Sequence, residues 1–336
     1  RMDAAAHAYT SRGVNLALQL MNAPGWAIHS KYKNVDKNAW RYPREEVHQR
    51  AYISALLQRY GEHTQFVQIF NEPDQTRFWS GQPEEFVSQF QYSRDEIQKY
   101  AGEKSLPIVN GGYSLFEKEK TAYFAEQLKG QLDMVAYHCH GDLNALIEDF
   151  SFVKKLHEKS GYENPRFVNT EMGFDGWRLD QELRKGQFVP QKTLYCWATG
   201  HAGALLFGSR MTLGPNRRSQ DFGFLDHYFC PRYVYGSVAA MVSELAGASF
   251  DSVLLEEDNR FVYQFTREDK RIVAAFTLDQ TAEIKIACDA TAAIQIDAMG
   301  NREKIETPGT VHMKLSNYPV YLEWTNAGAA AVVTLQ

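Results

Sequence analysis

Short apolar runs alternate with amphipathic stretches over the first two thirds of the chain, and this alternation restricts the fold more than any other feature. Six runs in residues 1–230 have the length and apolar character of strands that are buried on both faces. They are Asn15–Met21, Gln65–Phe70, Pro107–Gly112, Met134–His140, Arg166–Gly173 and Ala204–Gly208. Helical stretches separate them, which predicts parallel strands joined by crossover helices in an α/β fold. Two architectures remain open: an open doubly wound sheet, or a barrel whose first two strands are absent from this chain.

Two of the helical stretches have a clear apolar stripe. In Arg44–Tyr60, apolar residues recur at the spacing of one helix face, at Ile53, Leu56, Leu57 and Tyr60. Another helix is predicted to begin at Pro83, because a proline suits the first helical turn, where its missing N–H leaves no bond unmade. Its expected buried stripe is Phe86, Phe90, Ser93 and Ile97.

The sequence texture changes near residue 248. Beyond it, short alternating runs with turns every 8–12 residues predict an antiparallel β-sandwich. The seven expected strands are Phe261–Thr266, Ile272–Thr277, Ile284–Ala287, Ile294–Asp297, Val311–Leu315, Val320–Trp324 and Val332–Leu335. We therefore predict two domains, residues 1–248 and residues 249–336.

Composition excludes several classes of protein. The 44% hydrophobic and 23% charged fractions are typical of a globular chain and argue against disorder. The net charge of −5, with the two signs interspersed, argues against a nucleic-acid partner and against an anionic membrane. The four cysteines form no CxxC pair, and no apolar run reaches the length of a membrane-spanning helix. The compartment is not fixed by the sequence, and a secreted or periplasmic protein is one candidate.

Two of the apolar runs end in a glutamate. Phe66–Phe70 leads into Asn71-Glu72-Pro73, and the run that begins at Phe167 ends in Glu171. Because loops at the carboxyl ends of parallel strands meet at one mouth, both carboxyl groups are expected in the same cavity. Glycoside hydrolysis uses such a pair, with one carboxyl group protonating the leaving oxygen and the other attacking the anomeric carbon. The alternative is two ordinary glutamates that cap nearby helices.

The Asn71-Glu72-Pro73 strand end resembles the acid/base signature of glycoside hydrolase clan A, the retaining (β/α)8-barrel glycosidases. The resemblance implies a TIM-type barrel with Glu72 as acid/base after strand 4 and Glu171 as nucleophile after strand 7. This chain would then start near the helix before strand 3, and strands 1 and 2 would be cut off or supplied elsewhere. Asn71-Glu72-Pro73-Asp74 with Phe78-Trp79 is similar to family 39. The exit run Phe222–Asp226, followed by Pro231 and Tyr235, is also similar to that family.

Other residues enter as expected substrate contacts. Many clan members carry His-x-Tyr at the end of strand 6, where this chain has His138-Cys139-His140, so the tyrosine role falls on a histidine. Phe207 stands where the clan usually has the tryptophan of strand 8. Residues in or near loops at the same face complete the predicted sugar-binding set: Asn71, Trp26, Trp79, Asn110 and Trp177.

The predicted function is a retaining glycosidase that acts on an oligosaccharide or polysaccharide. It needs no cofactor and no metal. One rival function is a non-catalytic carbohydrate-binding barrel. Another is a metal-dependent hydrolase centred on His138 and His140, because His-x-His is also a metal-binding pattern. An N-terminal segment that completes the barrel is a further possible partner.

Overall fold

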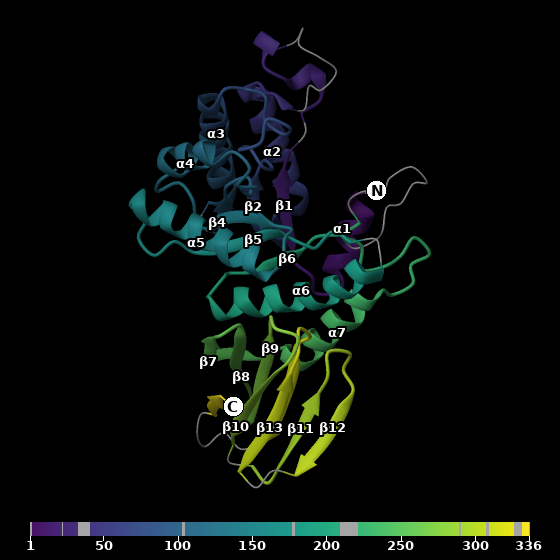
Figure 1. The fold of residues 1–336 in the computed structure, drawn as a ribbon. Helices are drawn as coiled ribbons and strands as arrows, with labels where there is room; N and C mark the ends of the chain where they lie inside the picture. Colours follow the sequence, from purple (N-terminus) through teal and green to yellow (C-terminus); the bar gives the residue numbers. More distant parts are fainter. Residues whose placement is uncertain are drawn as a thin grey trace. The chain divides into compact units, whose positions relative to one another are not determined.

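The computed structural model describes residues 2–21, 23–32, 41–102, 105–176, 179–208, 221–288, 290–306, 309–325 and 331–335 (Figure 1). The chain forms two compact units. One consists of Arg1–Cys139 and Ile147–Thr170, and the other of His140–Leu146 and Glu171–Gln336. No helix in the described part of the chain is long and apolar enough to cross a membrane.

The first unit is built on parallel strands that follow one another in sequence order. β1 (Leu16–Leu20), β2 (Thr64–Ile69) and β3 (Ile108–Val109) form one parallel sheet in the order β1-β2-β3. Parallel bridges from Val109 to Met134 and from Tyr113 to Tyr137 extend this arrangement to β4 (Val135–Cys139). The connecting helices are α2 (Glu46–Tyr60), α3 (Pro83–Ala101) and α4 (Lys118–Gln127), and α1 (Met2–Thr10) precedes β1.

The helices α2 and α3 begin and pack largely as their sequences predict. Pro83 occupies the first turn of α3, and the Glu85 side chain accepts a hydrogen bond from the Gln82 backbone N–H, which closes a capping box. The expected stripe of α3 is buried throughout. In α2, Leu56 is only half-buried, and the polar Gln49 takes a buried place on the stripe instead.

A second sheet has the order β4-β5-β6. β5 spans Phe167–Met172 and β6 spans Ala204–Leu206, and the helices of this part are α5 (Leu143–Lys159), α6 (Leu179–Ala198) and α7 (Tyr233–Leu245). All six strands predicted for residues 1–230 are therefore present, and the α/β class is confirmed. Closure into an eight-stranded barrel stays a prediction.

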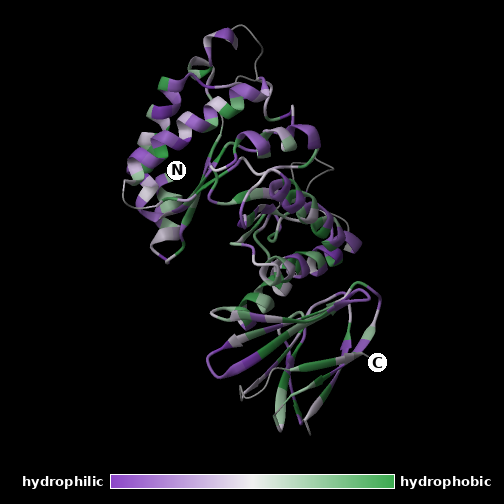
Figure 2. Cartoon of the chain, turned by 90° about the vertical axis from the view of Figure 1, so that its left-hand side faces the viewer, coloured by the Kyte–Doolittle hydropathy of each residue, from purple (hydrophilic) through white to green (hydrophobic). Residues whose placement is uncertain are grey.

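Residues from Ser249 onward form antiparallel strands, as expected. The strands are β7 (Ser249–Glu257), β8 (Arg260–Arg267), β9 (Lys270–Thr277), β10 (Ala282–Ala287), β11 (Ala292–Ile296), β12 (Arg302–Glu306), β13 (Thr310–Leu315), β14 (Val320–Thr325) and β15 (Val332–Leu335). A six-stranded sheet of order β12-β11-β14-β9-β8-β7 accompanies a three-stranded sheet of order β13-β10-β15. Hydrophobic and hydrophilic residues are interspersed along these strands (Figure 2), and β13 alternates exposed and buried side chains at every position. This period of two marks a strand with one buried face.

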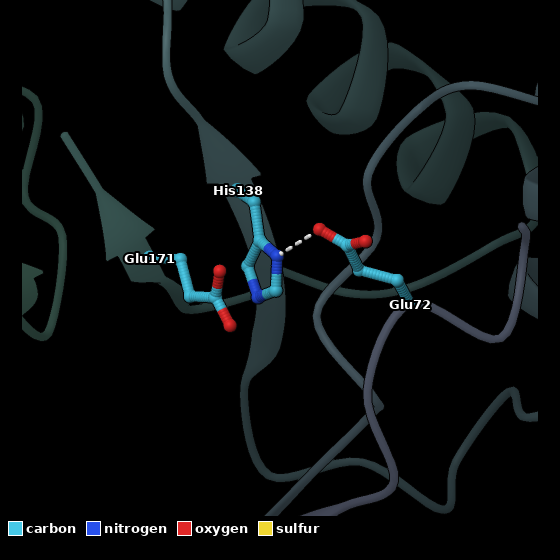
Figure 3. A group of neighbouring side chains, drawn as sticks. All are labelled: Glu72, His138 and Glu171. Atoms are coloured by element: carbon cyan, nitrogen blue, oxygen red, sulfur yellow. Dashed lines mark hydrogen bonds and ion pairs between the residues drawn. The ribbon is translucent and has the colours of Figure 1, made fainter. Parts of the chain in front are cut away.

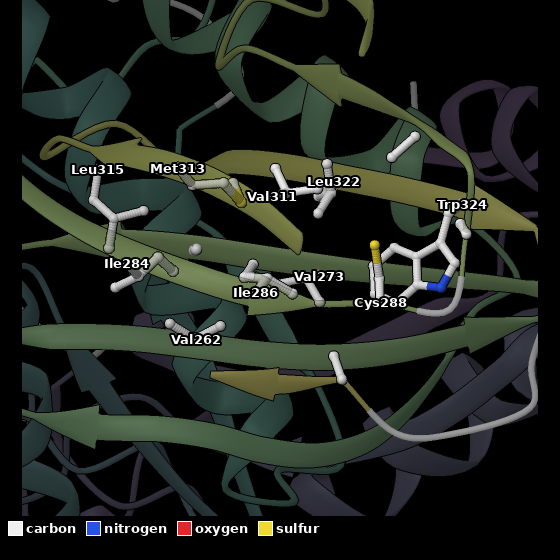
Figure 4. Packing of buried hydrophobic residues seen from close by; sticks show 14 residues of the cluster. Val262, Val273, Ile284, Ile286, Cys288, Val311, Met313, Leu315, Leu322 and Trp324 are labelled. Atoms are coloured by element: carbon white, nitrogen blue, oxygen red, sulfur yellow. The ribbon is translucent and has the colours of Figure 1, made fainter. Parts of the chain in front are cut away.

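The core between the two sheets is apolar (Figure 4). Val262, Val273 and Leu322 from the larger sheet pack with Ile284 and Met313 from the smaller one, and all five are at most 1% exposed. The opposite face of the larger sheet meets α6 and α7. There the Trp197 and Phe265 rings lie 5.1 Å apart, and the Tyr233 and Tyr318 rings 5.6 Å apart. The central strands β8 and β9 of the larger sheet are thus buried on both faces.

Two strands of this region were missed, β7 and β12. They are the two edges of the six-stranded sheet. β12 is charged and almost fully exposed, and β7 contains two register shifts, so neither shows a clean alternation of apolar residues. The division into domains at residue 248 stays a prediction, since the two compact units divide the chain elsewhere.

Candidate active site

The segment after β2 leaves the strand through an uncommon backbone conformation. Phe70 has φ 77° and Glu72 has φ 44°, both in the left-handed region that side chains other than glycine rarely adopt. The Phe70 N–H donates to the Leu20 carbonyl (3.0 Å), and the Glu72 N–H donates to the Gly111 carbonyl (2.7 Å). Each such residue costs on the order of 1–3 kcal/mol and persists only where its surroundings enforce it. The bonds to the neighbouring strands therefore hold Glu72 in one place.

The Glu72 carboxyl group is enclosed and hydrogen-bonded at both oxygens. Oε1 lies 2.7 Å from His138 Nδ1 (Figure 3), and Oε2 accepts from the Gln75 amide at 2.7 Å. The residue is only 7% exposed. This arrangement fixes the carboxyl rotamer and provides a partner that can give or take a proton.

His138 is held by contacts on both sides of its ring. Its Nε2 lies 3.2 Å from Thr170 Oγ1, while Nδ1 faces Glu72. A Cβ at Gly112 would lie 2.2 Å from His138 Nε2, and Gly112 has φ 66°, so only glycine fits there. Both ring nitrogens face protein oxygens, which fixes the orientation of the His138 ring.

Two further polar residues next to Glu72 are buried. Asn71 is 4% exposed, and its Oδ1 accepts from Gln19 Nε2 at 2.7 Å. Asp74 is fully buried and accepts from the Ser114 and Leu115 backbone N–H groups. Burial raises the pKa of Asp74, and these hydrogen bonds oppose the rise. Asp74 thereby ties the loop that follows Glu72 to the loop that follows β3.

Glu171 follows Thr170 directly on β5, and its carboxylate lies next to His140. Its Oε2 lies 3.4 Å from His140 Nε2, and the two side chains are 18% and 31% exposed. The His140 ring packs against Phe207 at 5.1 Å and against Phe222 at 4.8 Å between ring centroids. The expected grouping of His140 with Phe207 and Glu171 is therefore present in the second unit.

No family model and no curated protein matches this sequence. Solved structures match over nearly the whole chain. A family 39 glycoside hydrolase from the gut symbiont Bacteroides cellulosilyticus WH2 has a TM-score of 0.74 at 16% identity, over 96% of this chain and 70% of its own. A family 30 endoxylanase from Clostridium papyrosolvens C71 has 0.64 at 15%, over 97% and 83%. A monomeric beta-xylosidase from Caulobacter crescentus CB15 has 0.63 at 13%, over 97% and 84%.

The chain has the fold of these glycoside hydrolases. The resemblance to clan A and to family 39 is thus confirmed at the level of the fold. Identities of 13–16% carry no more than the fold, so the chemistry has to be argued from the residues of this chain.

Two predicted sugar contacts have other roles in the structure. Asn110 is fully buried, and its side-chain amide bonds the backbone N–H and carbonyl of Ala136, which joins β3 to β4. Trp79 is 1% exposed, packs against Phe70 and Phe86, and donates its indole N–H to a backbone carbonyl. Neither side chain is open to a ligand, so the structure does not support the prediction that these two residues contact the substrate.

The remaining predicted contacts differ in their surroundings. Trp26 is 69% exposed on the loop after β1, with its ring edge against His48. Phe207 is 38% exposed. Trp177 lies outside the described residues.

Sequence reasoning missed four residues that contact the site residues: Gln19, Gln75, Thr170 and Phe222. Position gave a signal for two of them, since Thr170 precedes Glu171 and Gln75 follows Glu72 by three residues in a tight turn. Gln19 and Phe222 reach their partners only through the tertiary structure.

Proposed function

We propose that this chain is the catalytic part of a retaining glycoside hydrolase, with Glu72 as acid/base and Glu171 as nucleophile. The observation that carries the proposal is the Glu72 carboxyl group, held on a strained strand end and paired with a buried histidine. Strained, enclosed residues of this kind are typical of catalytic positions. The fold shared with families 39 and 30 supports the same reaction class.

Glu72 is suited to both halves of the reaction because its contact with His138 serves two protonation states. A protonated Glu72 donates to an unprotonated Nδ1. An ionised Glu72 accepts from a protonated Nδ1 at the same distance between heavy atoms. Glu72 can therefore give its proton to the leaving oxygen in the first step and remove a proton from water in the second.

Glu171 is suited to nucleophilic attack. It is more open to solvent than Glu72, and the His140 imidazole beside Oε2 can donate to the ionised carboxylate. Attack on the anomeric carbon forms a glycosyl-enzyme ester as the glycosidic bond breaks. Water then cleaves that ester and restores the original configuration. Retention requires the two carboxyl groups to be about 5 Å apart, whereas inversion requires roughly 6.5–9.5 Å.

Xylan and β-xylosides are the proposed first substrates, because the neighbours named above include an endoxylanase and a beta-xylosidase. Gln19 fixes the Asn71 oxygen, which leaves the Asn71 amide nitrogen as the group to meet a sugar hydroxyl. Phe207 and Trp26 offer exposed aromatic faces on which a sugar ring could stack. The xylose unit is thus proposed as the sugar that the site binds.

The test is a substrate screen with aryl β-glycosides and polysaccharides, xylan among them, run beside Glu171→Ala. We expect turnover that disappears in the variant, and NMR of the first product should show the anomeric configuration of the substrate. Turnover with inverted product would reject the retaining mechanism. Turnover that survives in Glu171→Ala would reject Glu171 as the nucleophile. Turnover that a chelator abolishes would favour the metal-dependent alternative.

A further inference from the structure

Helix α6 carries two lysines with fully buried side chains, Lys185 and Lys192. They are seven residues apart, which is about two helical turns, so both project from the same side of α6. Burying an ammonium group is unfavourable unless acceptors replace the lost water. The acceptors in both cases include backbone carbonyls of loops, and they differ between the two lysines.

The acceptors of Lys192 lie next to two site residues. Its Nζ donates to the Gly141 carbonyl at 2.8 Å and to the Gly173 carbonyl at 2.6 Å. Gly141 follows His140 directly, and Gly173 lies two residues beyond Glu171. One ammonium group thus joins the two segments that carry the His140–Glu171 pair.

Both glycines lie close to neighbouring side chains. A Cβ at Gly173 would lie 2.9 Å from Phe222 Cδ1 and 3.3 Å from His140 Nδ1. A Cβ at Gly141 would lie 2.5 Å from Ala145 Cβ. Neither position has room for a side chain, and the carbonyl oxygens of both glycines accept from Lys192.

We propose that Lys192 is a positioning residue that keeps Glu171 and His140 in the geometry required for nucleophilic attack. The inference rests on the proposed function and adds a residue to it. The His140–Glu171 contact is 3.4 Å, which is long for a charge-assisted hydrogen bond, so a small shift of either segment breaks it. A displacement of about 1 Å at a catalytic group can lower the rate by roughly 10²-fold.

Lys185 provides a matched control on the same helix. It is equally buried, and its Nζ donates to the Gly176 carbonyl at 2.9 Å and to the Asp221 carbonyl at 2.8 Å. Gly176 is five residues beyond Glu171, and neither acceptor adjoins Glu171 or His140 in the chain. Removing Lys185 frees the backbone of Gly176 and of Asp221, which precedes Phe222, and takes a charge from Glu182 and Asp221, but it leaves the segments next to Glu171 and His140 held by Lys192.

The experiment compares the wild-type chain with Lys192→Met and Lys185→Met on an aryl glycoside that the wild type turns over. Urea unfolding, kcat, KM and the pH profile of kcat/KM are measured for each. We expect both variants to lose stability, and only Lys192→Met to lose kcat by roughly 10²-fold with KM changed by less than about threefold. The acidic limb of its pH profile should also shift, because the Glu171–His140 contact is altered.

Equal kcat in the two variants, after correction for the folded fraction, would overturn the inference. If Lys192→Met does not fold, Lys192→Arg takes its place. A guanidinium group spans the two carbonyls at a different distance, so kcat should fall with KM nearly unchanged, and an unaltered kcat would count against the proposal. A wild-type chain without any glycosidase activity would instead remove the proposed function, and this inference with it.

Discussion

Glu72 and Glu171 each have a histidine from the same strand end, yet their surroundings differ. In the His138–Glu72 pair the side chains are 2% and 9% exposed, and Gln75 and Thr170 complete the hydrogen bonding. In the His140–Glu171 pair they are 31% and 18% exposed, at a longer distance and among aromatic rings. The backbone differs as well, since Glu72 lies on a strained turn and Glu171 on a regular strand.

The difference indicates how one pair of residue types can serve two tasks. The short, enclosed contact of Glu72 with His138 suits the proposed acid/base, which exchanges a proton. The more exposed Glu171 suits the proposed nucleophile, which has to meet a sugar ring. Substitutions that disturb each glutamate–histidine pair separately test whether the two glutamates have different tasks.

Replacing Glu171, the proposed nucleophile, should have the largest effect. We expect Glu171→Ala to lose about 10⁴-fold or more of kcat, because no glycosyl-enzyme can form. Added azide should restore turnover of an activated aryl glycoside in the cavity left by the side chain. The product should be a glycosyl azide with the anomeric configuration inverted, which NMR identifies. Azide rescue with inversion in Glu72→Ala instead would exchange the two roles.

Replacing Glu72, the proposed acid/base, should have the next largest effect. Glu72→Gln keeps the size of the side chain and removes its proton transfer, so kcat for a poor leaving group should fall by roughly 10²–10⁴-fold. A dinitrophenyl glycoside needs no protonation to leave, and its first step should be nearly unaffected. Steady-state rates with the two leaving groups, together with pre-steady-state bursts, measure this. If the rate of the first step fell equally for both leaving groups, the assignment of Glu72 as acid/base would be contradicted.

Much of the fold, and the position of Glu72 and Glu171 at or just beyond the ends of β2 and β5, could be predicted from the sequence for a physical reason. Short apolar runs mark β2 (Phe66, Val67 and Ile69) and β5 (Phe167 and Val168), so a glutamate that follows either run is conspicuous. The strands β7 and β12 have no such signature, because β12 is charged and exposed and β7 contains two register shifts, and both were missed. The pattern of burial, more than strand propensity, made the strands predictable.

The rest of the site depends on tertiary contacts that leave no mark in the sequence. Trp79 and Asn110 lie where loops usually meet ligands, but one packs in the core and the other bonds across the sheet. Lys185 and Lys192 look like ordinary surface lysines of an amphipathic helix, and both are fully buried. Gly112 lies so close to the His138 ring that a Cβ would clash with Nε2, which the sequence alone does not reveal.

A substitution at Gly112 should disturb the His138–Glu72 pair and leave the His140–Glu171 pair in place. Gly112→Ala introduces a Cβ 2.2 Å from His138 Nε2, so the imidazole must move away from Glu72 or Thr170. Gly130→Ala is the matched control, because Gly130 has a similar positive φ (72°) and no neighbour within 4 Å of the added Cβ. Both variants should lose about 1–2 kcal/mol of stability through the backbone. Only Gly112→Ala should lose kcat, by roughly 10–100-fold. Equal activity in the two would mean that His138 does not support Glu72.

The smallest effect is expected in the loop that follows Glu171, where Lys185 bonds Gly176 and Asp221. Burial is the main cause that lowers the pKa of Lys185 from 10.5 to about 8, with Arg232 adding to the decrease and nearby carboxylates opposing it. Between these two values the unfolded chain binds the proton and the folded chain has released it. Stability from this group therefore rises with pH through that window and is flat below about pH 8.

The contribution of Lys185 is measured by urea unfolding of the wild type and Lys185→Met at two pH values, one just below and one well within that window. The tyrosines and cysteines that also titrate are common to both proteins, so their contribution cancels in the comparison. The advantage of the wild type should grow at the higher pH by on the order of 1–3 kcal/mol. The neutral amine still has two hydrogens for its two carbonyl acceptors, so the loop should stay closed and kcat should not follow the change in stability. A constant difference between the two proteins would mean that Lys185 stays charged. A parallel loss of kcat would mean that this part of the loop, and not only the segment held by Lys192, sets the position of Glu171.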